Sequence, residues 1–341
     1  MLRERILQAL EENMGALVSG GCLAERFGVS RAAVWKVMKA LKEEGYPVDS
    51  VKNSGYRLSG HGNMLSEKMI RRDLTAKVLG NTIELLKVTD STNTRLKRTD
   101  PGAVREGRVV IADGQSEGRG RKNRPFFSPQ GEGVYMSVLL KPDIALGDAH
   151  FITICAVLAV CGAIERVCGI SPEIKWVNDV YCSGRKLCGI LSEGAVSMEM
   201  QAMDSVVVGI GLNTGEIPDG LEATATSLSR LTGRRNLRNP LVAEILNGME
   251  KLYFDLTRRN RKKALLEEYR SRQFILGEKV EVVGPQGAFT AWARNIDEEG
   301  CLVVEDDSGH TRHLRSEEVS LGPWVRECDS STTGFRLGSR N

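Results

Sequence analysis

Residues 114–137 combine glycine and arginine in a pattern that suits anion binding. The segment reads GQSEGRGRKNRPFFSPQGEGVYMS, with Arg119, Arg121, Lys122 and Arg124 among its glycines. Glycine lets the backbone approach a ligand closely, and guanidinium groups beside exposed N–H groups bind phosphate or carboxylate. The spacing fits neither the dinucleotide-binding glycine pattern nor a phosphate-binding P-loop. The segment therefore predicts an anion clamp, with a solvated basic linker as the alternative.

Two further segments offer polar groups to the same site. DSTN at residues 90–93 carries small hydroxyl and amide groups, and KWVND at residues 175–179 ends a predicted strand with an ammonium group. Each has a plain structural explanation, because the first can cap a helix and the second can be a strand end followed by a hairpin turn. Their occurrence together with the basic loop favours one shared binding site.

The length and composition predict more than one domain. The chain has 341 residues, of which 41% are hydrophobic, so it can bury a core larger than one ordinary domain needs. Its 47 Lys and Arg residues against 44 Asp and Glu residues leave a net charge of only +3. Binding to nucleic acid therefore requires a local cationic patch.

Cysteine, histidine and apolar patterns indicate a reduced, cytoplasmic protein. None of the eight cysteines forms a C-x-x-C pair. His310 and His313 are close in sequence but have no thiolate nearby, so we expect no metal site there. The apolar run from Phe151 ends at Glu165, short of the roughly 18 residues that a membrane span needs, and the N-terminus lacks a signal peptide pattern. We expect neither export nor membrane insertion.

Residues 1–62 predict a winged helix-turn-helix domain. Apolar residues recur at helical spacing in three segments, Gly28 separates the second and third, and two short strand-like pieces follow. Such a domain places its last helix in the DNA major groove, where flanking cations meet phosphates. The alternative is a small helical packing module. The cations that we expect to contact DNA are Arg31, Lys36, Lys39 and Lys52.

The rest of the chain predicts an α+β domain, a small β-barrel and a tail. Residues 66–272 alternate strands and helices, with antiparallel hairpin signals that disfavour a doubly wound sheet. Residues 276–323 contain short strands separated by Gly and Asp turns, as in a small barrel. Residues 326–341 are polar and aperiodic, which predicts disorder.

The motifs in this order resemble those of the biotin protein ligases and, with the N-terminal module, the bifunctional biotin ligase/repressors. The resemblance covers nearly the whole chain before the tail. The matching segments are DSTN (90–93), Gln115, GRGR (118–121), SPQGEGVYMS (128–137), KWVND (175–179), GRKLCGIL (184–191), GIGLN (209–213) and ATSL (225–228).

The resemblance implies a class II aminoacyl-tRNA synthetase-like catalytic domain and an SH3-like C-terminal barrel. It also implies that ATP, with Mg²⁺, activates biotin to biotinyl-AMP, and that the biotinyl group passes to a lysine of a biotin carboxyl carrier domain. A mobile cationic loop then has a purpose, because it can close over the adenylate and exclude water. Operator DNA is the implied second partner, and we expect a homodimer when biotinyl-AMP is bound.

The resemblance also implies roles for individual residues. The pocket for the biotin ureido group is assigned to Ser91, Thr92, Asn93 and Gln115. The segment Arg119, Gly120 and Arg121 is assigned to closing over biotinyl-adenylate, and Lys175 to contacts with the carboxyl and phosphate oxygens. Contacts to the nucleotide are assigned to Gly118, Phe126, Asn178 and Asn213. The catalytic group comprises Lys175 and Arg121, which offset charge on the phosphate, and Asp179, which helps to deprotonate or orient the carrier lysine.

The sequence departs from the usual family pattern at three positions. Asn123 replaces a common glycine, Phe126 a frequent tryptophan and Val177 a frequent proline. Asn tolerates left-handed backbone geometry, and Phe keeps an aromatic face without the indole donor. Two other functions stay open: lipoate or octanoate attachment, which would not explain the N-terminal module, and biotin sensing without catalysis.

Overall fold

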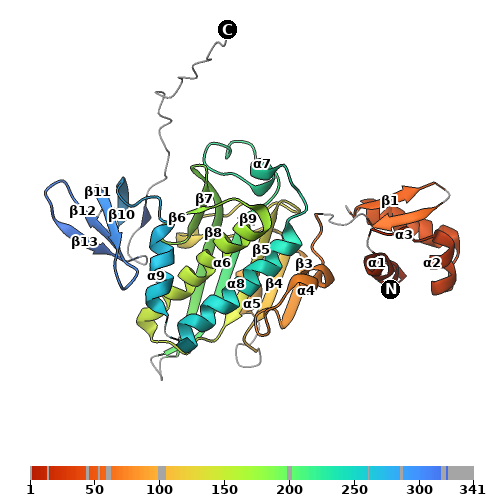
Figure 1. Cartoon of the computed structure of the whole chain (residues 1–341), viewed down its shortest axis with the longest axis horizontal. Coiled ribbons are helices and arrows are strands. Elements are labelled where there is room, and N and C mark those ends of the chain that lie inside the picture. The colour runs from red at the N-terminus through yellow and green to blue at the C-terminus, as the bar shows by residue number, and fades with distance from the viewer. Residues whose placement is uncertain are drawn as a thin grey trace, which may run out of the picture.

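The computed structural model confirms a multidomain α+β protein (Figure 1). The tail predicted at residues 326–341 lies outside the described residues. The structure describes residues 2–13, 15–43, 46–52, 54–58, 63–98, 105–197, 202–259, 261–284, 287–315 and 320–321.

The N-terminal region folds as three helices followed by a two-stranded hairpin. Gly28 ends the second helix in left-handed geometry at φ 65°, and the Ser30 hydroxyl accepts a hydrogen bond from the Ala33 N–H at 3.1 Å to begin the third. Ile6, Leu10 and the apolar face of the third helix form a core of their own. The elements are α1 (Leu2–Glu12), α2 (Gly20–Phe27), α3 (Arg31–Glu43), β1 (Val48–Val51) and β2 (Gly55–Leu58).

The central region is built on a seven-stranded sheet with the order β3-β4-β5-β9-β8-β7-β6. The β3–β4 pair is parallel, and every other neighbouring pair is antiparallel, as the hairpin signals predicted. The strands are β3 (Thr82–Thr89), β4 (Arg108–Gln115), β5 (Gly133–Leu140), β6 (Glu173–Lys175), β7 (Asp179–Cys182), β8 (Arg185–Ser197) and β9 (Ala202–Asn213).

Helices cover both faces of this sheet. Along β4, Val109 and Ile111 point into the main core, whereas Val110 packs with Leu96 of α5 in a separate cluster. Figure 1 shows α6 and α8 side by side across one face. The helices are α4 (Glu67–Asp73), α5 (Thr92–Lys97), α6 (His150–Cys168), α7 (Leu228–Thr232), α8 (Arg238–Arg259) and α9 (Lys262–Ser271).

Helix α6 is longer and more apolar than the run from Phe151 suggested. The segment Leu146–Cys168 has 23 residues and contains an 18-residue stretch with a mean hydropathy of 2.0, which by length and composition is sufficient to cross a membrane. The prediction that this apolar segment is too short to span a membrane is therefore wrong. However, 67% of this 18-residue stretch is buried inside the protein, because α6 packs between the sheet and α8. These contacts are those of a core helix.

The C-terminal region is a five-stranded antiparallel sheet with the order β13-β12-β11-β10-β14. Its inward-facing residues, including Val282 and Leu302, belong to the same apolar cluster as the central domain. The strands are β10 (Lys279–Gly284), β11 (Gly287–Ile296), β12 (Leu302–Glu305), β13 (Thr311–Leu314) and β14 (Ser320–Leu321).

Candidate active site

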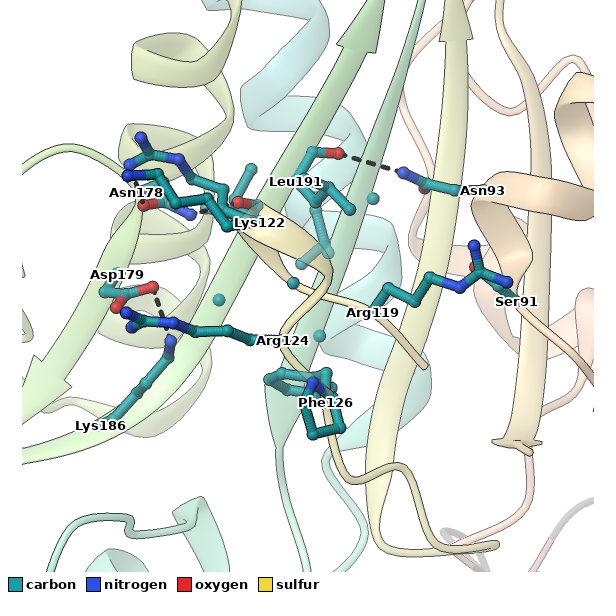
Figure 2. Close-up of a pocket in the computed structure, with 18 of the residues that line it drawn as sticks. Ser91, Asn93, Arg119, Lys122, Arg124, Phe126, Asn178, Asp179, Lys186 and Leu191 are labelled. Atoms are coloured by element: carbon teal, nitrogen blue, oxygen red, sulfur yellow. Dashed lines mark hydrogen bonds and ion pairs between the residues drawn. The ribbon is translucent and has the colours of Figure 1, made fainter. Parts of the chain in front are cut away.

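The three predicted segments meet at a cavity of about 230 Å³ beside β8 and β9 (Figure 2). Six lining side chains are cationic and one, Asp179, is anionic, so the cavity suits a ligand with several negative charges. The predicted residues that line it are Ser91, Thr92, Asn93, Gln115, Arg119, Gly120, Arg121, Phe126, Lys175, Asn178 and Asp179.

Residues 116–128, which we call the glycine-arginine loop, form a hairpin-like turn along one side of this cavity. Arg119 and Pro125 make an isolated β-bridge, and the Gly120 N–H donates to the Arg124 carbonyl at 2.7 Å. Lys122 and Asn123 adopt left-handed geometry at φ 54° and 55° at the tip. Asn123 thus occupies the conformation that its usual glycine counterpart would favour.

Gly118 does not line the cavity, but the turn depends on it. A Cβ atom at this position would lie 2.4 Å from the Phe126 carbonyl oxygen and 2.6 Å from the Ser128 hydroxyl. The Phe126 ring lies so close to Gly211 of β9 that a Cβ there would be 2.4 Å from it. Glycine at position 118 of the loop and at position 211 of β9 therefore lets the loop and the Phe126 ring lie against the sheet.

Gln115 connects the start of α5 to the base of the loop. Its Oε1 accepts hydrogen bonds from the Thr92 N–H at 2.8 Å and the Thr92 hydroxyl at 3.1 Å, and its Nε2 donates to Ser128 at 2.9 Å. Ser91 occupies the N-cap position of α5 but makes no side-chain capping bond, and it is buried. The interpretation of the Ser91 hydroxyl as a helix cap is therefore wrong, and this hydroxyl lines the cavity instead.

The Asn93 side chain braces α5 against the sheet. Its Nδ2 donates to the Leu191 carbonyl at 3.2 Å, as Figure 2 shows, and to Glu193 at 2.7 Å. Its Oδ1 accepts from the Ser137 hydroxyl at 2.6 Å. Both ends of the amide are thus bonded within the protein, so in this structure Asn93 shapes the pocket wall.

Lys175 is a buried cation at the end of β6. The residue is only 6% exposed, and burial lowers the pKa of its ammonium group to about 8. Asp179 opposes this decrease, whereas the cations Lys186 and Arg124 add to it. Lys175 therefore presents a concentrated positive charge whose protonation changes close to neutral pH.

Lys186 lines the cavity, although the sequence did not indicate it as a site residue. Its Nζ lies 2.7 Å from an Asp179 carboxylate oxygen, and both side chains line the cavity (Figure 2). Lys186 comes from the start of β8, opposite Tyr181 of β7. Lys186 belongs to the GRKLCGIL motif, but its pairing with Asp179 follows from the β7–β8 register, which a single sequence does not reveal.

Asn178 and Asn213 lie in different surroundings. The Asn178 side chain donates to the Ile190 carbonyl at 2.5 Å and accepts a long contact of 3.5 Å from Arg121, so it tethers the loop to β8. Asn213, at the end of β9, does not line the cavity, and its amide donates to the Thr226 carbonyl at 3.2 Å.

The N-terminal cations predicted to contact DNA are placed on the surface. Arg31, Lys36 and Lys39 are exposed on α3, and Lys52 is exposed next to the hairpin. Among the residues that the structure describes, no group of three or more His, Cys, Asp or Glu side chains could hold a metal ion. His313 instead lies 2.7 Å from Asp297.

The chain belongs to the biotin/lipoate A/B protein ligase family, whose model matches residues 85–213, and an HTH domain model matches residues 2–57. It is 35% identical to the bifunctional ligase/repressor BirA of Bacillus subtilis (strain 168), over 94% of this chain and 99% of that protein. It is 26% identical to BirA of Escherichia coli (strain K12), over 90% of this chain and 94% of that protein.

A solved structure shares the fold of the ligase region. The biotin protein ligase from Aquifex aeolicus, in complex with biotin and ATP, matches with a TM-score of 0.62 and 30% identity. The match covers 71% of this chain and 99% of that protein. The family resemblance inferred from the motifs is thus confirmed.

Proposed function

We propose that this protein uses ATP to convert biotin to biotinyl-AMP and transfers the biotinyl group to a lysine of a biotin carboxyl carrier domain. The main support is the cavity, where Lys175, Lys186 and the cations of the glycine-arginine loop surround a space bounded by the polar start of α5. This arrangement suits a small polar ligand joined to a phosphate. A relative that matches 94% of this chain is named as a bifunctional ligase/repressor, and one that matches 74% is named as a biotin–[acetyl-CoA-carboxylase] ligase.

In the first step, a biotin carboxylate oxygen attacks the α-phosphorus of ATP, and the bond to the β-phosphate oxygen breaks to release pyrophosphate. No proton transfer is required. Lys175, Lys186 and Arg121 line the cavity and offset the charge that develops on the phosphate oxygens. Mg²⁺, when bound, would supply further charge neutralisation, and Asp179 is the one carboxylate among the described lining residues that could help to hold it.

In the second step, the neutral amine of the carrier lysine attacks the acyl carbon of the mixed anhydride, the bond from this carbon to the phosphate oxygen breaks to release AMP, and the nitrogen gives up one proton to the leaving phosphate or to water. Among the described residues that line the cavity, Asp179 is the one carboxylate, and it forms an ion pair with Lys186. We assign Asp179 to orienting Lys186 and the incoming amine. An Asp179→Ala variant that folds normally and transfers biotin at the wild-type rate would exclude this role.

Biotin-dependent exchange of pyrophosphate into ATP tests adenylate formation directly. Lys175→Ala should lose this exchange, because one preorganised charge contributes about 3 kcal/mol to such a transition state. The variant should retain its fold. Wild-type protein without exchange activity would indicate a biotin sensor that does not catalyse. Exchange that depends on lipoate or octanoate instead of biotin would indicate the related ligase activity.

We also propose that the N-terminal domain binds operator DNA and that biotinyl-AMP promotes a homodimer in the cytoplasm. A loop that closes on the adenylate can complete an interface, and two joined winged helices read a two-fold site better than one. Biotin with ATP should slow trypsin cleavage after Arg119, Arg121 and Lys122, increase the sedimenting mass and strengthen DNA binding. Loop protection without a change in mass or DNA affinity would refute the regulatory part.

The domain boundaries are part of this proposal: 1–62, 66–272 and 276–323. A fragment without residues 1–62 should retain exchange activity, because the cavity residues all lie beyond that segment. Residues 66–272 and 276–323 share one apolar cluster, so we expect them to unfold together. Loss of folding in the fragment would refute the first boundary.

A further inference from the structure

Trp35 is a large apolar side chain that the N-terminal domain leaves in solvent. It lies on α3 and is 54% exposed. The core-facing side of the same helix is already formed by Val34, Met38 and Leu41, which are at most 1% exposed. One residue along a helix turns the side chain by about 100°, so Trp35 points away from that core. Packing of the domain therefore does not account for an indole at this position.

Cations surround the exposed indole. Arg31 and Lys39 are one helical turn before and after it, and the Lys39 ammonium lies 5.8 Å from the centre of its ring. Helix α3 carries four cations and one carboxylate, Glu43, which is 3.7 Å from Lys39. An apolar group within a positive surface is complementary to a polyanion that also presents apolar groups. A second copy of this cationic face is a poor match, since like charges repel.

The position of Trp35 in the helix favours contact with bases. Residues in the N-terminal half of a recognition helix lie against base edges, whereas flanking cations contact phosphates. Trp35 is the fifth of the 13 residues of α3, and Ala32 is exposed one turn before it. The apolar group that DNA presents in the major groove is the thymine C5-methyl.

We propose that Trp35 contacts thymine methyl groups in the major groove and thereby sets part of the sequence specificity of this domain. This inference rests on the proposed DNA-binding function. The cations Arg31, Lys36 and Lys39 supply affinity that is independent of sequence, and the indole, with Ala32, supplies discrimination between thymine and the other bases.

The test uses full-length protein with biotin and ATP at a fixed salt concentration. Duplexes that bind wild-type protein are selected from a pool randomised over about 40 base pairs, roughly four helical turns. Each thymine of the selected duplex is then replaced singly by deoxyuridine, which removes only the methyl group. Wild-type affinity should fall about tenfold at one or more thymines, within the range of a single lost base contact. Trp35→Ala should bind about tenfold more weakly and should not respond to the same replacements.

Two variants separate this contact from other causes. Lys36→Ala should lose affinity and reduce the slope of log affinity against log salt by about one, while keeping the deoxyuridine response. Leu17→Ala removes another exposed apolar side chain, 46% exposed and outside α3, and should bind as wild type. The N-terminal domain has a core of its own, so its unfolding transition, followed by circular dichroism, should match that of wild type in every variant.

The outcomes that overturn the inference are distinct. Trp35→Ala that selects the same sequence with the same deoxyuridine response shows that the indole does not read thymine. Trp35→Ala that fails to dimerise while wild type dimerises shows that the indole is a protein contact. Wild-type protein that selects no sequence refutes sequence-specific DNA binding, and the inference about Trp35 fails with it.

Discussion

The indole Nε1–H of Trp176 donates a hydrogen bond to the Gly300 carbonyl, with 3.1 Å between nitrogen and oxygen. Trp176 follows Lys175 and lines the active-site cavity, whereas Gly300 lies in the turn between β11 and β12 of the C-terminal sheet. Val177 follows Trp176 in the turn between β6 and β7, and its carbonyl accepts a hydrogen bond from the Tyr269 hydroxyl at 2.7 Å. The C-terminal region and α9 therefore fix the backbone that carries Lys175.

Gly300→Ala should impair both stability and adenylate formation. Gly300 has φ 75°, and a Cβ there would lie 2.9 Å from His150 Nε2. Gly309 has a similar φ of 84° with no atom within 4 Å of its Cβ. Left-handed geometry costs a non-glycine residue about 1 kcal/mol, so Gly309→Ala measures that cost alone. Urea unfolding should show a larger loss for Gly300→Ala, and only this variant should lose exchange activity. Equal losses in stability and activity would refute the link to Lys175.

The lowered pKa of Lys175 predicts a specific pH dependence of stability. Between pH 8 and 10.5 the unfolded lysine keeps a proton that the folded lysine has released. The unfolded state thus binds more protons, and the free energy of unfolding should rise with pH in this window by up to about 3 kcal/mol. Lys175→Met should lack this contribution. Subtracting the free energy of unfolding of Lys175→Met from that of wild type at each pH cancels the contribution of tyrosine titration. A difference that does not change with pH would contradict the lowered pKa of Lys175.

The same group predicts the alkaline limit of activity. Adenylate formation requires the charged form of Lys175, so kcat/KM for exchange should decline as pH rises through about 8 in the free enzyme. Lys175→Arg keeps its charge at this pH and should not show that decline, whatever its absolute rate. If kcat/KM of Lys175→Arg declined with pH as in wild type, the decline would belong to a group other than Lys175.

The sequence was sufficient for the segments of the site but not for all of its contacts. Motif order identified residues 90–93, 118–121 and 175–179, and these segments do meet at one cavity. Lys186 was missed because its partner depends on the β7–β8 pairing, which shifts register between Val180 and Tyr181. Such a bulge changes which side chains face each other and leaves no clear signal in one sequence.

Helix ends and buried helices were the weaker predictions for a related reason. Ser91 has the residue type and position of a helix cap, yet its hydroxyl makes no capping bond. Helix α6 is apolar on nearly all sides because the sheet, α8 and α9 cover it, so its sequence has no polar face that marks a soluble helix. In both cases tertiary contacts decide the outcome.

Gly118→Ala and Gly120→Ala should have different effects although the two residues are neighbours in the loop. A Cβ at Gly118 would overlap the Phe126 carbonyl at 2.4 Å, whereas a Cβ at Gly120 would meet the Arg124 carbonyl at an ordinary 3.6 Å. Gly118→Ala should therefore displace Phe126, speed trypsin cleavage of the loop and reduce exchange by at least about tenfold. Gly120→Ala should leave the unliganded loop and its trypsin cleavage nearly as in wild type. Similar cleavage rates for both variants would show that Gly118 is not required for the observed loop geometry.

Arg238 is a buried charge that no motif indicated. It is 1% exposed, and its guanidinium donates to Asp113 at 2.6 Å and to the carbonyls of Gly133 and Asn63 at 2.7 and 2.9 Å. It thereby joins β4 and β5 to residue 63, which precedes the ligase region. Asp113 is two residues before Gln115, so this ion pair also supports the strand end that lines the cavity.

Asp113→Asn should destabilise the protein by about 3 kcal/mol, because it removes one partner and leaves the charge of Arg238 buried and uncompensated. Glu216→Gln is the matched control. It breaks an ion pair with Arg235 whose side chains are 60% and 67% exposed, and such pairs contribute less than about 1 kcal/mol. Urea unfolding at neutral pH measures both losses. If the two variants lost equal stability, the carbonyl hydrogen bonds of Gly133 and Asn63 would suffice to hold Arg238, and the ion pair would not stabilise the junction.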